Sequence, residues 1–308
     1  MKSQELCNYL ERLRSARNMS QETFTTGVVS LRQYRRYLNG ESDIPFQVVD
    51  QLSEKLGVQT INLLREIEAV RLEEQKEIDE FYNNIANYNF EPVKDKIALL
   101  EQREFVDVSN KMLFDHAIYM YKLFTNQISR ETAATLNREL FNMNKIHKQS
   151  IFTEVEMFVL SSILDLSDDE KETHFISEKL KNYLLDSSSI VGSTYGFGFN
   201  LVIYRLSKYS GKNKNYQDVL EYCDFGIQRN FKLLNFYLME YFFYFKSLAY
   251  YRMGDYEKYE DSLVKCFHAL QLEGNNKKNQ KFTDLIQKDF DVNLVDLVME
   301  YYRKNSSD

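Results

Sequence analysis

Helix breakers are almost absent from this chain, and that scarcity constrains its fold more than any other feature. Only 2 prolines and 10 glycines interrupt 308 residues. Long stretches rich in Leu, Glu, Lys, Phe and Tyr therefore run without a residue that ends a helix, whereas a protein of many short strands needs frequent turn residues. Because 44% of the residues are hydrophobic, a sizeable core can be buried. We expect an all-α protein.

Four short helices are predicted within the first sixty residues. Ser20 and Ser30 are of the residue type that caps helix N-termini, and each precedes a short segment with helical periodicity. The third helix should span residues 31–38 and end at Asn39-Gly40, a left-handed C-terminal signal. Pro45 suits the first turn of a fourth helix. The apolar residues expected to form the core of this bundle include Leu10, Leu13, Val48, Val49, Leu52 and Leu56.

The predicted third helix carries three arginines within five positions. The 3.6-residue period directs Tyr34, Tyr37 and Leu38 toward the bundle and leaves Arg32 and Arg36 together on the outer face. Three arginines taken alone usually form a solvated surface. Here they lie on the third helix of a predicted helix-turn-helix, which in such proteins reads the major groove of DNA. The candidate DNA-binding residues are Gln21, Ser30, Arg32, Gln33, Arg35 and Arg36.

Charge is divided unevenly along the chain. Residues 1–60 hold 8 Lys or Arg against 7 Asp or Glu (net +1), which leaves 31 against 39 (net −8) for residues 61–308. An acidic body repels the phosphates of nucleic acid. Any contact with double-stranded DNA is therefore expected in the first sixty residues.

The segments MSQETF, VVSLRQYRRYLNGES and LSEKLGV resemble the Xre/Cro-type helix-turn-helix. That family usually begins its second helix with Thr/Ser-Gln-Glu and has a third helix that starts with Ser and ends in Asn-Gly. Val28 replaces a frequent Gly of the family pattern, and Leu38 replaces a frequent Glu. These departures concern the shape of the turn more than the positions that face DNA.

A second informative segment is FKSLAYYRMGDYEKYEDSLVKCFHAL, residues 245–270. It predicts two helices joined at Gly254-Asp255, with Tyr259, Leu263 and Cys266 directed inward. This hairpin resembles a tetratricopeptide repeat (TPR). Residues 213–230 read as the second helix of the preceding hairpin, and helical stretches near 111–126, 131–145, 153–165 and 174–185 have compatible lengths.

Stacked helical hairpins form a TPR-like α-solenoid with a concave groove that suits an extended or helical peptide. Amides in such a groove can pair with both the N–H and the C=O of a peptide backbone. The aromatic residues of 235–251 are mainly expected in the core. The candidates for peptide contact are Asn200, Tyr204, Asn235 and Phe242.

The order of these parts resembles the Rgg/MutR family and, more broadly, the RRNPP-type peptide-pheromone receptors of Gram-positive bacteria. The resemblance implies a homodimeric transcription regulator for quorum sensing, whose repeat groove binds a short signalling peptide after import. It divides the chain into a DNA-binding domain at 1–62, a helical linker at 63–92 that we expect to be solvated, and a regulatory domain at 93–308. The alternative is a TPR-type adaptor that binds other proteins and uses its helix-turn-helix as a docking module.

No catalytic constellation is found, so we expect neither an enzyme nor a cofactor. The three cysteines and four histidines are widely spaced and predict no metal site. GSTYGFGFN, residues 192–200, lacks the Lys-Ser/Thr of a phosphate-binding loop and is better explained as a helix–helix connection. No run of about 18 apolar residues occurs to span a membrane. These features favour a cytoplasmic protein.

Overall fold

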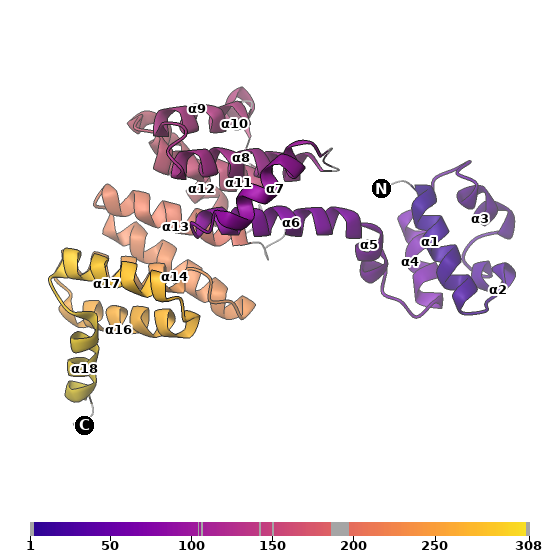
Figure 1. The fold of residues 1–308 in the computed structure, drawn as a ribbon. Coiled ribbons are helices and arrows are strands. Elements are labelled where there is room, and N and C mark those ends of the chain that lie inside the picture. Colours follow the sequence, from indigo (N-terminus) through magenta and orange to yellow (C-terminus); the bar gives the residue numbers. More distant parts are fainter. Residues whose placement is uncertain are drawn as a thin grey trace. The chain divides into compact units, whose positions relative to one another are not determined.

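The computed structural model describes residues 3–103, 105, 107–141, 143–149, 151–185 and 197–305. These residues form eighteen α-helices and no strand (Figure 1), which confirms the all-α class. The chain divides into two compact units, Met1–Phe114 and Asp115–Asp308, with the boundary inside α8.

The first unit contains α1 (Ser3–Ala16), α2 (Gln21–Thr25), α3 (Leu31–Leu38), α4 (Phe46–Lys55), α5 (Thr60–Ile67), α6 (Ala69–Ala86), α7 (Glu91–Glu101) and the start of α8 (Val108–Phe124). The second contains the rest of α8 and then α9 (Arg130–Glu139), α10 (Met143–Lys148), α11 (Glu154–Leu166), α12 (Glu170–Leu185), α13 (Phe197–Lys212), α14 (Tyr216–Leu233), α15 (Met239–Met253), α16 (Tyr256–Glu273), α17 (Asn276–Phe290) and α18 (Leu294–Asn305).

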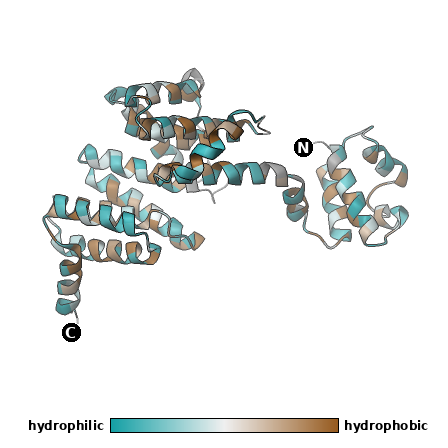
Figure 2. Ribbon diagram, viewed as in Figure 1, coloured by the Kyte–Doolittle hydropathy of each residue, from teal (hydrophilic) through white to brown (hydrophobic). Residues whose placement is uncertain are grey.

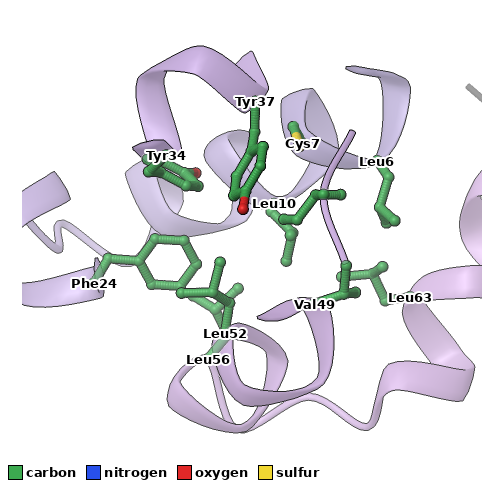
Figure 3. Packing of buried hydrophobic residues seen from close by; sticks show 11 residues of the cluster. Leu6, Cys7, Leu10, Phe24, Tyr34, Tyr37, Val49, Leu52, Leu56 and Leu63 are labelled. Carbon is green, nitrogen blue, oxygen red and sulfur yellow. The ribbon is translucent and has the colours of Figure 1, made fainter. Parts of the chain in front are cut away.

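The helices α1 to α5 form a bundle around one hydrophobic core (Figure 3). Tyr34 of α3 packs edge-on against Phe24 of α2, with ring centroids 5.6 Å apart. Both rings are completely buried. Leu63 also belongs to this core, although the predicted domain boundary after residue 62 assigns it to the linker. The fifth helix therefore completes the bundle.

The linker is helical, but the prediction that it is solvated was wrong for α6. One face of α6 is buried, including Ile78, Phe81 and Ile85. Glu74 on the same face is completely buried and accepts hydrogen bonds from the Asn110 side chain at 2.8 Å and from the backbone N–H of Asp107 at 3.3 Å. The prediction rested on the many charged residues of this segment and overlooked the helical spacing of Ile78, Phe81 and Ile85, which form an apolar stripe.

The second unit is built from successive helical hairpins. The helices α13 and α14 pair with each other, as do α15 and α16, and α13 also packs against α11 and α15. The first helices of successive hairpins thus lie side by side, which is the arrangement of a TPR-like solenoid. Figure 2 shows hydrophobic and hydrophilic residues sharing most of these helices, as expected for amphipathic elements that bury one face.

The α15–α16 hairpin forms as its sequence predicts. Gly254 ends α15 with φ +80°, and the Asp255 side chain caps α16 by accepting a hydrogen bond from the backbone N–H of Lys258. Tyr259, Leu263 and Cys266 are buried. Between α14 and α15, Gly226 leaves room for the Phe242 ring, because a Cβ at this glycine would lie 2.7 Å from ring carbons.

Candidate functional site

The helix-turn-helix consists of α2, the turn and α3. The Ser20 hydroxyl accepts a hydrogen bond from the backbone N–H of Thr23 at 3.0 Å, and the Ser30 hydroxyl accepts one from the backbone N–H of Gln33 at 3.2 Å. Both predicted caps are therefore present. Gly27 supplies the left-handed residue of the turn, with φ +77°, so a glycine at position 28 is not needed.

The three arginines of α3 are exposed, while Tyr34 and Tyr37 on the opposite side are buried, as the helical period predicts. Arg32 makes no ion pair or hydrogen bond within the part of the chain that the structure describes. Arg36 lies 3.5 Å from a carboxylate oxygen of Glu41, and both side chains are about half exposed. Arg32 is thus free to meet a base edge or a phosphate.

Gln21 and Gln33 flank the arginines and are half-buried. The Arg35 Nε donates to the Gln21 Oε1 at 3.4 Å, which joins the start of α2 to α3. The Gln33 Nε2 donates to the Ser42 hydroxyl at 2.9 Å. The structure thus brings all six predicted DNA-binding residues onto or beside α2 and α3. We call Gln21, Ser30, Arg32, Gln33, Arg35 and Arg36 the reading face.

Beneath the reading face lies a carboxylate that sequence reasoning missed. Glu11 of α1 accepts hydrogen bonds from the Arg14 guanidinium at 2.7 and 2.8 Å, from the Gln21 side chain at 2.8 Å and from the Tyr34 hydroxyl at 2.9 Å. These donors, with Arg14 the strongest, lower the pKa of Glu11 to about 2 against its partial burial. Glu11 therefore fixes both α2 and α3 to α1.

Lys55 of α4 is a second contact without a sequence signal. Its ammonium donates to the carbonyl of Thr23 at 3.2 Å and to the carbonyl of Thr26. Thr23 lies in α2 and Thr26 directly follows it. Because α2 is only five residues long, most of its carbonyls have no hydrogen-bond donor within the helix. Lys55 thus joins α4 to α2, the first helix of the motif.

The predicted peptide-binding residues occupy different environments. Asn200 is completely buried: its amide donates to the Asn230 Oδ1 at 2.7 Å and to the carbonyl of Tyr237 at 3.1 Å, and its oxygen accepts from Arg229 at 3.0 Å. Phe242 is also completely buried. Both side chains hold α13, α14 and α15 together. Their assignment as peptide contacts stays a prediction, and this geometry does not favour it.

The other two candidates are accessible. Asn235 is half-buried in the connection between α14 and α15, where its Oδ1 accepts from the backbone N–H of Tyr237 at 2.9 Å. Tyr204 is half-buried on α13 and stacks on Phe245 of α15 at 5.4 Å between centroids. Tyr241 meets Tyr204 edge-on at 5.0 Å. Tyr204, Tyr241 and Phe245 form a continuous half-buried surface that we call the aromatic strip.

Two kinds of feature are absent from the described ranges, a metal-ligand cluster and a membrane-spanning helix. No group of three or more His, Cys, Asp or Glu side chains could hold a metal ion there. Nor is any of the described helices long and apolar enough to cross a bilayer. Of the glycine-rich segment, residues 192–196 lie outside the described residues, and the remainder begins α13.

Known proteins resemble this chain in fold but not in sequence. The sequence matches no protein-family model and no curated protein. Solved structures, however, are similar over nearly the whole chain. Bacillus thuringiensis PlcR, in complex with the peptide PapR7 and DNA, is 12% identical with a TM-score of 0.63, over 90% of this chain and 98% of that chain. The Streptococcus dysgalactiae SHP pheromone receptor Rgg2 is 13% identical with a TM-score of 0.56, over 92% and 99%.

ComR from S. thermophilus, in complex with DNA and its signalling peptide ComS, is 13% identical with a TM-score of 0.52, over 92% of this chain and 99% of that chain. The three similarities extend through both the helix-turn-helix bundle and the helical hairpins. At such low identity they show a shared fold: an N-terminal helix-turn-helix followed by a helical repeat array.

Proposed function

We propose that this protein is a DNA-binding transcription regulator controlled by a short signalling peptide. The observation that carries the proposal is the reading face, where Arg32 and Arg35 project from α3 beside the capped start of α2. An arginine on a recognition helix makes bidentate contacts to guanine or contacts phosphate. The rest of the chain is acidic, so DNA is expected to meet this face alone.

The shared fold supports both halves of the proposal. The similar structures of PlcR and ComR are described as complexes with DNA and a peptide, and Rgg2 is described as a pheromone receptor. All three are regulators rather than enzymes. By analogy the chain belongs with the RRNPP-type regulators and acts in the cytoplasm, where DNA and an imported peptide meet.

The DNA half is tested by selecting binding sites from genomic fragments and then measuring variants on the selected site. We expect Arg32→Ala to cost about 1–3 kcal/mol on that site and to relax preference at one base pair, because Arg32 reads a base. Arg35→Ala should weaken all sequences alike and flatten the salt dependence, because Arg35 contacts phosphate. Arg36→Ala, measured in the same way, shows whether Arg36 contacts a base or a phosphate.

The matched control is Arg65→Ala, which removes an exposed arginine from α5 outside the reading face. If all three α3 variants bind as wild type does, the arginines form only a solvated surface. If wild type binds no fragment, the helix-turn-helix is a docking module and the protein is an adaptor.

The peptide half rests on the aromatic strip between α13 and α15. Half-buried aromatic side chains give a peptide large contact area at low cost in conformational entropy. Tyr204→Ala and Asn235→Ala are expected to weaken the peptide response in a reporter assay while leaving DNA binding intact. A normal response from both variants would remove these residues from the site.

A homodimer is the third element of the proposal, because one short helix reads too few base pairs and two reading heads multiply specificity. The helix α18 supports self-association. Val295, Met299 and Tyr302 share one face of α18 and are about half exposed, so this apolar face is accessible within the described chain. The first turn of α18 is acidic and its last turn is basic, so two antiparallel copies are complementary.

Light scattering at micromolar concentration tests this surface. We expect wild type to be a dimer and Met299→Glu to be a monomer, because a charge would be buried at the centre of the contact. Met253→Glu, at another half-exposed methionine, is the matched control. A dimer that tolerates Met299→Glu must use another surface.

A further inference from the structure

A pocket of about 620 Å³ lies between α13, α14 and α15. Its apolar lining includes Val219, Phe245 and Leu248. Phe245 belongs to the aromatic strip as well, so the pocket continues the surface that we propose for the peptide. A peptide that extends along the strip past Phe245 would enter this pocket.

Four cations line the same pocket: Lys208 and Lys212 from α13, Lys214 from the following turn, and Arg252 from the last turn of α15. This concentration is opposite in sign to the rest of the chain, since residues 61–308 carry a net charge of −8. No acidic side chain lines the pocket among the described residues. The local potential therefore attracts an anion.

Only one of these cations makes a direct ion pair within the described part of the chain. The Lys208 ammonium lies 2.7 Å from a carboxylate oxygen of Asp165. Within the described part of the chain, Lys212, Lys214 and Arg252 make no ion pair. Desolvation lowers the pKa of Lys212 below its usual value and the neighbouring Lys208 ammonium lowers it further, while the carboxylates of Asp165 and Asp168 act in the opposite direction. A bound anion would relieve that repulsion.

We infer that this pocket binds a carboxylate of the signalling peptide together with the apolar side chain next to it. The inference rests on the proposed peptide-binding function and specifies its ligand chemistry. The Arg252 guanidinium supplies a planar pair of donors that matches a carboxylate, and Lys212 and Lys214 add positive charge. The floor formed by Phe245 and Leu248 accepts the neighbouring apolar side chain. The carboxylate is either the free C-terminus of the peptide or an acidic side chain near its end.

The test uses the full-length protein and two degenerate heptapeptide libraries, one with free C-terminal carboxylates and one with C-terminal amides. Peptides retained by the protein on ultrafiltration are identified by mass spectrometry. If the C-terminus is bound, the free-acid library is retained about tenfold better, with apolar residues enriched at the last position. If an acidic side chain is bound, both libraries are retained and Asp or Glu is enriched at one position.

Two variants tie either result to the pocket. Lys212→Gln and Arg252→Gln remove one charge each from exposed positions and are expected to reduce retention of the selected peptides about 3- to 10-fold. Lys232→Gln, at an exposed lysine in the last turn of α14 that does not line the pocket, should have no effect.

The outcomes separate this inference from the function on which it rests. Retention of peptides without a carboxylate preference, or unchanged retention by both pocket variants, would overturn the inference and leave a peptide receptor with another anchor. Retention of no peptide by wild type would overturn the peptide-binding proposal itself. DNA binding by the reading face is measured separately and stands or fails independently.

Discussion

The helix-turn-helix bundle and the repeat array use polar side chains in different ways. In the bundle, the partly buried Glu11 side chain joins α1 to α2 and α3, and the arginines of α3 point outward. In the array, buried polar groups join one helix to the next: Arg205 of α13 donates to the carbonyl of Phe158 at 2.8 Å and to the Ser161 hydroxyl at 2.9 Å. Asn200 and Asn230 do the same between α13 and α14.

In the bundle, the exposed arginines proposed to bind DNA are therefore distinct from the residues that stabilise the fold. In the array, a substitution meant to test peptide binding can also destabilise the fold. Removing an exposed arginine from the bundle leaves no buried group unpaired. Removing a buried amide from the array takes a hydrogen bond away from each of its buried partners. Each buried polar group left without a hydrogen bond costs about 1–3 kcal/mol. A loss of peptide response in the array is therefore informative only when stability is measured as well.

The buried cysteines report on each region by itself. Cys7 lies in the core of the bundle, and Cys223 and Cys266 lie in the array. A disulfide reagent such as dithiodipyridine labels them only when the surrounding region unfolds. The urea dependence of labelling at each cysteine, read by mass spectrometry, therefore gives the stability of the two regions in one full-length chain.

The largest effect is expected for Phe242→Ala. This side chain is completely buried against Gly226, so its loss should leave a cavity and destabilise the array by about 3–5 kcal/mol. Cys223 and Cys266 should become reactive at lower urea while Cys7 is unchanged. Phe236→Ala removes a phenylalanine that is 59% exposed and serves as the control. Unchanged labelling of Cys223 and Cys266 would show that the stability of the array does not depend on the packing of Phe242.

Asn200→Ala should have the next largest effect. It removes one hydrogen-bond partner from each of Asn230, the Tyr237 carbonyl and Arg229, at a cost of about 2–3 kcal/mol to the array. Asn235→Ala breaks a single hydrogen bond at a half-buried position and should cost about 1 kcal/mol. Equal effects of the two variants on cysteine labelling would show that burial does not distinguish these amides.

Acid should act on the bundle through Glu11. Its folded-state pKa, about 2, lies below the usual 4.5, so its stabilisation is present above pH 4.5 and is lost as the pH falls from 4.5 to 2. After allowance for its partial exposure, the contribution is about 2 kcal/mol. The urea midpoint for Cys7 should therefore fall over this range in wild type. In Glu11→Gln it should be lower at pH 7 and change less with pH; a parallel fall in both proteins would assign acid sensitivity elsewhere.

The smallest stability effect is expected for Arg32→Ala. Its side chain is exposed and unpaired within the described structure, so the bundle should change by no more than about 0.5 kcal/mol. Arg32→Ala should thus weaken binding to the selected DNA site without changing stability, whereas Asn200→Ala should change the stability of the array. A large shift in the Cys7 midpoint would mean that Arg32 is part of the fold.

The sequence by itself determined the all-α class, the helix-turn-helix and its reading face. These features depend on local rules: Ser20 and Ser30 cap the helices that follow them, and the helical period puts Tyr34 inside and Arg32 outside. The Asp255 cap made the α15–α16 hairpin equally predictable. Each signal acts over a few residues, so no tertiary contact is needed to read it.

Only the tertiary structure decided the roles of Asn200, Glu11 and the pocket cations. The period of α13 does not reveal that Asn200 meets Asn230, which is thirty residues away, rather than a peptide. Nor does any local pattern bring Lys212 and Arg252 to one pocket, because they are neighbours only after α13, α14 and α15 have packed. Helical spacing fixes the direction of a side chain, whereas the packing of distant helices fixes what that side chain meets.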